Sequence, residues 1–163
     1  MKRIIVVAVI LVTVLLSGCI DADINTINDM ASSINSHLKK GDEYYNSSAT
    51  NANSMSLATA LTQCQNANDE YSSAQTSAQT ALNSAKNSND GIYIEYMQNV
   101  LLEIQAKLNA TSELKTAIIL LQNNQTSSAN THLGEANDYM NNALQYKKNR
   151  DTIVNQNPTK FKS

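Results

Sequence analysis

Residues 57–85 read LATALTQCQNANDEYSSAQTSAQTALNSA, with small and apolar side chains at alternating spacings of three and four. The positions on this alanine seam are Leu57, Ala60, Cys64, Ala67, Tyr71, Ala74, Ala78, Ala81 and Ala85. Such spacing predicts a helix that buries one face. Alanine buries little apolar area, but it lets a neighbouring backbone come close. We therefore expect a tight helix pair along residues 67–85.

The same spacing recurs along most of the chain after residue 22. Together with the seam it predicts four helices, at about residues 23–46, 54–87, 92–123 and 129–154. Gly41 interrupts the first apolar stripe, where it costs up to about 1 kcal/mol relative to alanine. Residues 47–53 are polar and are expected to form a loop. Before the third helix, Asn89 or Asp90 is able to cap its first turn.

The connections between these helices are short, which forces neighbouring helices to run antiparallel. The predicted fold is therefore all-α, an up-down-up-down four-helix bundle of long antiparallel helices spanning residues 23–154. The heptad spacing implies left-handed, coiled-coil-like packing. Two stacked helical hairpins are the alternative fold, although no repeat of 34 residues is visible.

The first 19 residues have the three parts of an export signal. Lys2 and Arg3 are basic, residues 4–16 are apolar except for Thr13, and Ser17-Gly18 precedes Cys19. This segment resembles the lipobox of prokaryotic membrane lipoproteins. The resemblance implies a signal peptide at 1–18, a diacylglyceryl thioether on Cys19, and a short tether at 19–22. Since the apolar run is about 13 residues and a membrane span needs roughly 20, a retained transmembrane anchor is the weaker alternative.

The composition of the mature chain agrees with export to the cell surface. Asn, Ser, Thr, Gln and Ala dominate it, and the polar richness resembles surface lipoproteins of methanogenic archaea or of low-GC bacteria. Asn46, Asn109 and Asn124 begin Asn-x-Ser/Thr triplets, which are candidates for N-glycosylation. We expect a lipid-anchored protein on the extracytoplasmic side of the cell membrane.

Residues that carry chemistry are few. With Cys19 assigned to lipid, Cys64 has no partner for an internal disulfide and is expected to be buried. His132 and Glu135 share a helix face, but one histidine with one carboxylate does not favour a metal site. No catalytic site, no metal, no cofactor and no nucleic-acid partner are expected. The tyrosines are candidates for a binding surface or for the edge of the core.

The C-terminal residues 147–163 hold five basic residues and one acidic residue, a net charge of +4. The basic residues are Lys147, Lys148, Arg150, Lys160 and Lys162. In an up-down-up-down bundle this end lies beside the start of the first helix, so the cluster is a candidate for contact with the membrane surface. The alternative is that its helical members complement the helix dipole. Residues 155–163 are expected to be a disordered tail.

These features favour a non-catalytic structural role or a role in protein interaction at the cell surface. The alternative is a ligand-binding lipoprotein that captures a small molecule between its helices. A cavity of several hundred Å³ lined by convergent polar groups would favour the alternative, and a filled core would favour the first.

Overall fold

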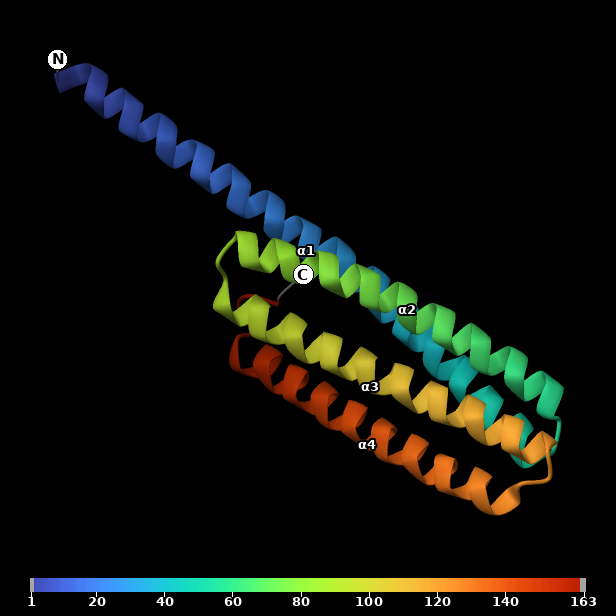
Figure 1. The fold of residues 1–163 in the computed structure, drawn as a ribbon. Helices are drawn as coiled ribbons and strands as arrows, with labels where there is room; N and C mark the ends of the chain where they lie inside the picture. Colours follow the sequence, from blue (N-terminus) through green and yellow to red (C-terminus); the bar gives the residue numbers. More distant parts are fainter. Residues whose placement is uncertain (1, 162–163) are drawn as a thin grey trace.

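A computed structural model describes the backbone of residues 2–161 and the side chains of Ile27 and of residues 29–161. Its helices are α1 (Lys2–Asn53), α2 (Leu57–Asn87), α3 (Gly91–Gln122) and α4 (Thr126–Gln156). Figure 1 shows them as long rods joined by short turns, each antiparallel to the next. The described residues contain no strand, and the prediction of an all-α four-helix bundle is confirmed.

The three turns between the helices share one backbone feature. Each contains one residue in the left-handed region, with φ of 58° at Met55, 52° at Asn89 and 57° at Asn124. Asparagine tolerates this region better than most residues, which suits two of the three turns. Asp90 then caps α3, because its carboxylate accepts hydrogen bonds from the backbone N–H groups of Ile92 at 3.0 Å and Tyr93 at 3.2 Å.

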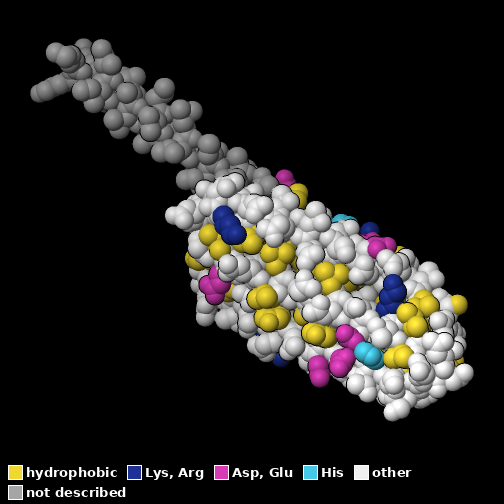
Figure 2. All heavy atoms as spheres, viewed as in Figure 1, with side chains coloured by type: hydrophobic (Ala, Val, Ile, Leu, Met, Phe, Trp, Pro, Cys, Tyr) yellow, Lys and Arg dark blue, Asp and Glu magenta, His cyan; other side chains and the backbone are white. Residues whose placement is uncertain are grey.

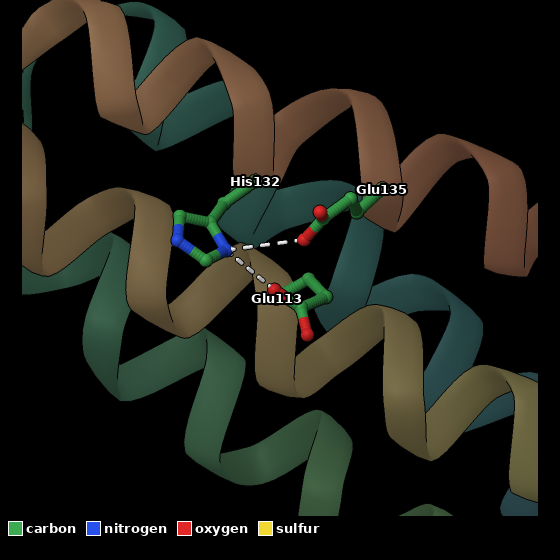
Figure 3. Close-up of side chains that lie close together, drawn as sticks. All are labelled: Glu113, His132 and Glu135. Carbon is green, nitrogen blue, oxygen red and sulfur yellow. Dashed lines mark hydrogen bonds and ion pairs between the residues drawn. The ribbon is translucent and has the colours of Figure 1, made fainter.

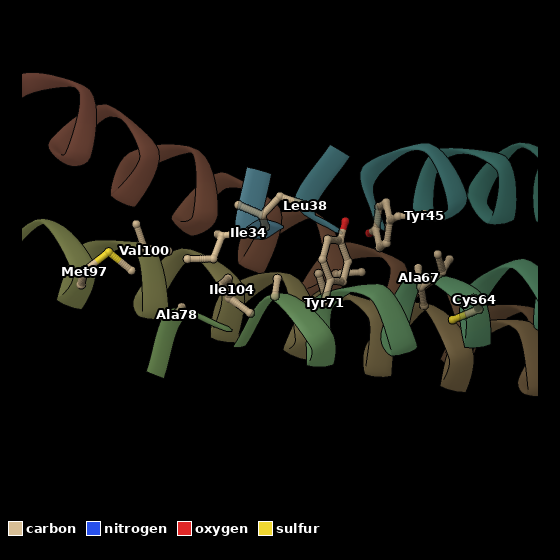
Figure 4. Close-up of a cluster of buried hydrophobic side chains, with 14 of the residues drawn as sticks. Ile34, Leu38, Tyr45, Cys64, Ala67, Tyr71, Ala78, Met97, Val100 and Ile104 are labelled. Atoms are coloured by element: carbon tan, nitrogen blue, oxygen red, sulfur yellow. The ribbon is translucent and has the colours of Figure 1, made fainter. Parts of the chain in front are cut away.

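The alanine seam of α2 is buried as the spacing predicts. Ala67, Ala74, Ala78 and Ala81 have no exposed surface, and Tyr71 between them is also fully buried. Figure 4 shows the seam facing side chains of α1 and α3, among them Ile34 and Ile104. The small residues let helices on both sides approach α2 closely.

Gly41 of α1 has a role that sequence analysis did not foresee. A Cβ atom at this position would lie 2.6 Å from Cδ1 and 3.0 Å from Cζ of the Tyr71 ring. The ring therefore occupies the space that a side chain would need. The Tyr71 hydroxyl donates a hydrogen bond of 2.7 Å to Asp42 Oδ1, which holds the ring in this position.

The prediction of a loop at residues 47–53 is wrong, because α1 continues to Asn53. Ser48 and Ala52 are buried against α2, and Ser48 Oγ donates a hydrogen bond of 2.8 Å to the Ala60 carbonyl. Thr50 Oγ1 donates to the Asn46 carbonyl one turn earlier at 2.9 Å. Polar side chains that bond to the helix's own carbonyls or to a neighbouring helix are compatible with helix here.

The expectation of disorder is also wrong for residues 155–161. Helix α4 continues to Gln156, and the Phe161 ring lies 5.1 Å from the Tyr93 ring and 5.0 Å from the Tyr96 ring, centroid to centroid. The Tyr93 hydroxyl also donates a hydrogen bond of 2.6 Å to the Lys160 carbonyl. The only phenylalanine of the chain thus covers apolar surface at the start of α3. Residues 162 and 163 lie outside the described part.

The helices pack mainly with their neighbours in sequence. Helix α1 packs on α2, α2 on α3, and α3 on α4, while α1 touches α3 over a small area. Among the described residues, no Cα atoms of α1 and α4 come within 8 Å of each other. Two open cavities lined by residues of α1, α3 and α4 show a groove between the two outer helices, with α3 at its floor.

Candidate functional site

The groove between α1 and α4 contains two cavities open to the surface, of about 340 and 330 Å³. We call it the α1–α4 groove. Its α1 wall includes Asn35, Leu38, Lys39, Asp42, Glu43 and Asn46, its α4 wall includes Met140, Leu144, Lys147 and Arg150, and its floor is Glu103 and Lys107 of α3. Basic and acidic groups thus both line a space the size of a small molecule.

Four charged groups at the base of the groove form a network. The side chains of Glu103 and Lys107 are 3% and 8% exposed, and that of Arg150 is 10% exposed. Arg150 Nη1 lies 3.3 Å from Glu103 Oε2, and Lys107 Nζ lies 3.8 Å from Glu103 Oε1. Lys107 also pairs with Asp42 of α1. The network links α1 to α3 and α4, although α1 packs little against α3 and has no Cα atom within 8 Å of α4 among the described residues.

Some buried polar atoms of this network have no hydrogen-bond partner in the described part of the chain. Glu103 Oε2 and Arg150 Nη1 are buried atoms without a hydrogen-bond partner among the described residues. Burial raises the pKa of Glu103, and the Arg150 guanidinium and the Lys107 ammonium only partly offset this effect. The Oε2 and Nη1 atoms form an ion pair with each other and are buried beneath the groove, so the charges that a ligand could reach are the exposed ones of the walls, such as Lys39, Glu43 and Lys147.

A different surface lies on the opposite pair of helices. Leu101 and Leu102 of α3 and four glutamines, Gln75, Gln79, Gln98 and Gln105, line a shallow cavity of about 470 Å³. We call it the glutamine–leucine surface. Leu102 is 47% exposed, and Gln75 Nε2 donates a hydrogen bond of 3.1 Å to Gln105 Oε1 across α2 and α3. The side chains that line it carry no formal charge and combine two leucines with four glutamines.

Figure 2 shows the side chains on one face of the molecule. Among the coloured atoms, hydrophobic side chains are scattered over an area that is mostly backbone and uncharged polar side chains. Several acidic side chains gather beside a histidine on that face.

The two histidines lie in similar surroundings on the two hairpins. His37 Nδ1 of α1 lies 2.6 Å from Glu70 Oε2 of α2, and His132 Nδ1 of α4 lies 2.6 Å from Glu113 Oε2 of α3. His132 has a second carboxylate, Glu135 Oε2, at 3.3 Å (Figure 3). The helical spacing of His132 and Glu135 predicts that they share a face. The sequence does not predict that Glu113 joins them, because only the register of α3 against α4 brings that residue close.

The predicted basic cluster is divided by the structure. Arg150 is buried against Glu103, so its assignment to the membrane surface is wrong. Lys147 lines the α1–α4 groove, and Lys148 is exposed to solvent. Lys160 pairs with Asp90, and its ammonium lies 5.7 Å from the centre of the Tyr93 ring. Lys162 lies outside the described residues.

The other predicted positions are distributed over the whole chain. Cys64 is buried as expected, and its Sγ donates to the Thr111 carbonyl at 3.2 Å. Burial raises the pKa of the Cys64 thiol to about 11, so it stays protonated at neutral pH. Asn46 is exposed on α1, Asn109 is half-buried on α3, and Asn124 is exposed in the turn before α4. The side chain of Cys19 lies outside the described part of the structure.

Comparisons with known proteins returned nothing for this chain: no family model, curated protein or solved structure matches it. Among the described residues, no helix combines the length and the hydropathy that crossing a membrane requires. The apolar side chains of residues 4–16 lie outside that part.

Proposed function

We propose that this chain is a lipid-anchored, extracytoplasmic helical bundle with a non-catalytic role in protein interaction at the cell surface. The lipobox-like sequence that ends at Cys19 supports the anchor and the location. The glutamine–leucine surface is the observation that supports the interaction role. Exposed apolar side chains beside polar ones are typical of protein–protein contact sites.

The glutamine–leucine surface has the composition that such a contact needs. Its cavity side chains carry no formal charge, so binding there does not require removal of water from buried ions. The amide groups of Gln75 and Gln105 form one hydrogen bond with each other. Since each amide has two N–H donors and one oxygen acceptor, both groups keep further donors or acceptors for a partner. Gln75 and Gln79 lie on α2, whose opposite face is the fully buried alanine seam.

The test is affinity capture of partners from native membranes. We expect Leu102→Glu to lose the partners that the wild-type protein captures, because a carboxylate at the centre of the contact would have to be desolvated. Ile119→Glu is the matched control, since Ile119 lies on the same helix, is 42% exposed and is not part of the cavity. Equal capture by both variants and the wild type would show that this surface does not carry the interaction.

The anchor has its own test. Cys19→Ser should yield protein without lipid, either as an unprocessed precursor or as a released form. Mass spectrometry of the membrane fraction checks this directly. Absence of an acyl adduct on wild-type Cys19 would contradict the proposed lipoprotein.

A second candidate function is capture of a small polar molecule in the α1–α4 groove. The observation that favours it is the cavity of about 340 Å³, which is lined by exposed charges of both signs, among them Glu43 and Lys147. A zwitterionic solute would match this lining, with its anionic group near Lys147 and its cationic group near Asp42 and Glu43.

A thermal-shift screen of zwitterionic solutes distinguishes this candidate from the first. A bound ligand should raise the melting temperature of the wild-type protein and of Leu102→Glu, but not that of Lys147→Gln. Lys148→Gln is the matched control, because Lys148 is exposed and is not among the cavity residues. A screen in which no solute stabilises the wild-type protein would remove this second candidate.

A further inference from the structure

We propose that Glu113, His132 and Glu135 form a binding site for a divalent transition-metal ion of the zinc class. The three side chains come from two helices and point toward one another in Figure 3. One ligand atom from each, an imidazole nitrogen and two carboxylate oxygens, lies within 4.8 Å of the other two. A site of three protein ligands leaves a fourth position open to water or to another ligand.

The distances are close to those of a tetrahedral site. Zinc bonds of about 2.0–2.1 Å place two tetrahedral ligand atoms roughly 3.3–3.4 Å apart. His132 Nδ1 and Glu135 Oε2 are 3.3 Å apart already. The 2.6 Å between His132 Nδ1 and Glu113 Oε2 is a hydrogen bond, which a small rotation of the carboxylate would open. The side chains are 33%, 25% and 51% exposed for His132, Glu113 and Glu135, so that rotation meets little resistance.

The local fold holds the three residues in place. His132 and Glu135 are three residues apart on α4 and therefore share one face of that helix. Helix α3 packs antiparallel to this face and supplies Glu113. The two carboxylates and the imidazole nitrogen therefore converge on a space where a divalent cation would meet negative charge and a nitrogen donor. A metal ion that binds here would release a proton from any imidazole that was protonated beforehand.

The chemistry of the donors selects the class of metal. An imidazole nitrogen suits zinc and its neighbours in the first transition row, whereas Mg²⁺ and Ca²⁺ prefer oxygen ligands and more of them. We therefore expect Zn²⁺ to bind and Mg²⁺ to bind much more weakly.

The other hairpin offers an internal control. His37 and Glu70 form a pair with the same 2.6 Å distance and nearly the same exposure, 32% and 22%. No third ligand completes that pair among the described residues. If a histidine–glutamate pair were sufficient for zinc, both hairpins would bind it, but the geometry points to the α3–α4 hairpin alone.

The experiment is titration of Zn²⁺ into the full chain in detergent, purified without a histidine tag and followed by calorimetry. We expect a saturable site that His132→Gln abolishes. Glu135→Gln should weaken binding by more than the roughly 10- to 100-fold that loss of an outer hydrogen-bonding partner costs. His37→Gln should bind as the wild-type protein does. Affinity should fall as the pH is lowered, and buffers with different ionisation enthalpies should reveal the released proton.

Two outcomes would overturn the site. One is the absence of saturable Zn²⁺ binding to the wild-type chain. The other is equal affinity of His132→Gln and the wild type, which would place the ion on groups that all variants share. Thermal melts without metal check that each variant is folded, and added Zn²⁺ should raise the melting temperature of the wild type and His37→Gln but not of His132→Gln.

Discussion

At the scale of single residues, Gly41 shows that a residue of low helix propensity can still be required by the packing of its helix. In an isolated helix, alanine would be more stable than glycine by up to about 1 kcal/mol. In the bundle, the added Cβ atom would meet the Tyr71 ring, which is fully buried and bonded to Asp42. Overpacking typically costs about 1–3 kcal/mol. We therefore expect Gly41→Ala to lower the melting temperature.

Gly134 is the matched control for this prediction. It also lies within a long helix, but a Cβ atom there would have nothing within 4 Å. Gly134→Ala should therefore raise the melting temperature, since only the helix propensity changes. Differential scanning calorimetry of both variants measures the contrast, and stabilisation by both would mean that Tyr71 moves aside at no cost.

The buried charges predict a pH-dependent effect at Arg150. Arg150→Gln removes the closest cation from Glu103, and removal of one partner of a buried pair costs about 3–5 kcal/mol. Because burial already raises the pKa of Glu103, the variant should raise it further. A raised folded-state pKa means stability that is present at acid pH and lost as the pH rises through that pKa. Urea unfolding should thus show that Arg150→Gln has a much lower free energy of unfolding than the wild type at pH 7, and that the difference becomes smaller toward pH 4. A difference that does not change with pH would contradict this prediction.

At the scale of helices, spacing alone predicts most of what the structure contains. The alternation of three and four predicts helices α2 and α3 and the buried alanine seam of α2, and Asp90 is recognisable as a cap. It does not predict that Glu103 and Lys107 of α3 are buried. The end of α1 and the order of residues 155–161 are not predictable this way. Both depend on contacts with other helices, those of Ser48 with α2 and of Phe161 with α3.

The candidate sites are less predictable than the helices. Glu113 lies close to His132, and Glu103 lies close to Arg150, only because of the register of α3 against α4. No local pattern records that register. The α1–α4 groove likewise follows from which helices pack directly, and short connections alone do not decide this.

Close packing of α2 leads to a prediction for the alanine seam. Ala78 has no exposed surface, so Ala78→Leu should force neighbouring side chains or backbone apart at a cost of about 1–3 kcal/mol. For a chain of this size, that lowers the melting temperature by roughly 2–4 °C per kcal/mol. Ala58→Leu is the control, because Ala58 is exposed on the same helix. A neutral or stabilising effect at Ala78 would show that the seam can accept volume.

At the scale of the whole molecule, the topology predicts how an anchored bundle stands on the membrane. The α2–α3 turn and Phe161 lie at the same end as Ile27, as Figure 1 and the contacts of Tyr93 agree. Ile27 follows Cys19 by eight positions, which is about 12 Å along a helix. The α1–α2 turn is at the other end, roughly 45 Å away along the 31 residues of α2. If Cys19 carries the lipid, the end with the α2–α3 turn is near the membrane and the α1–α2 turn is far from it.

Energy transfer to a lipid-headgroup acceptor in vesicles measures this arrangement. A donor dye is placed on Asn89→Cys in the α2–α3 turn or on Met55→Cys in the α1–α2 turn, both of which are exposed. Cys64 should not compete for the dye, because it is buried and its pKa is raised to about 11. An upright bundle gives strong transfer from position 89 and weak transfer from position 55. Equal transfer from the two positions would mean that the bundle lies flat, so that one side of the helices rather than one end faces the lipid.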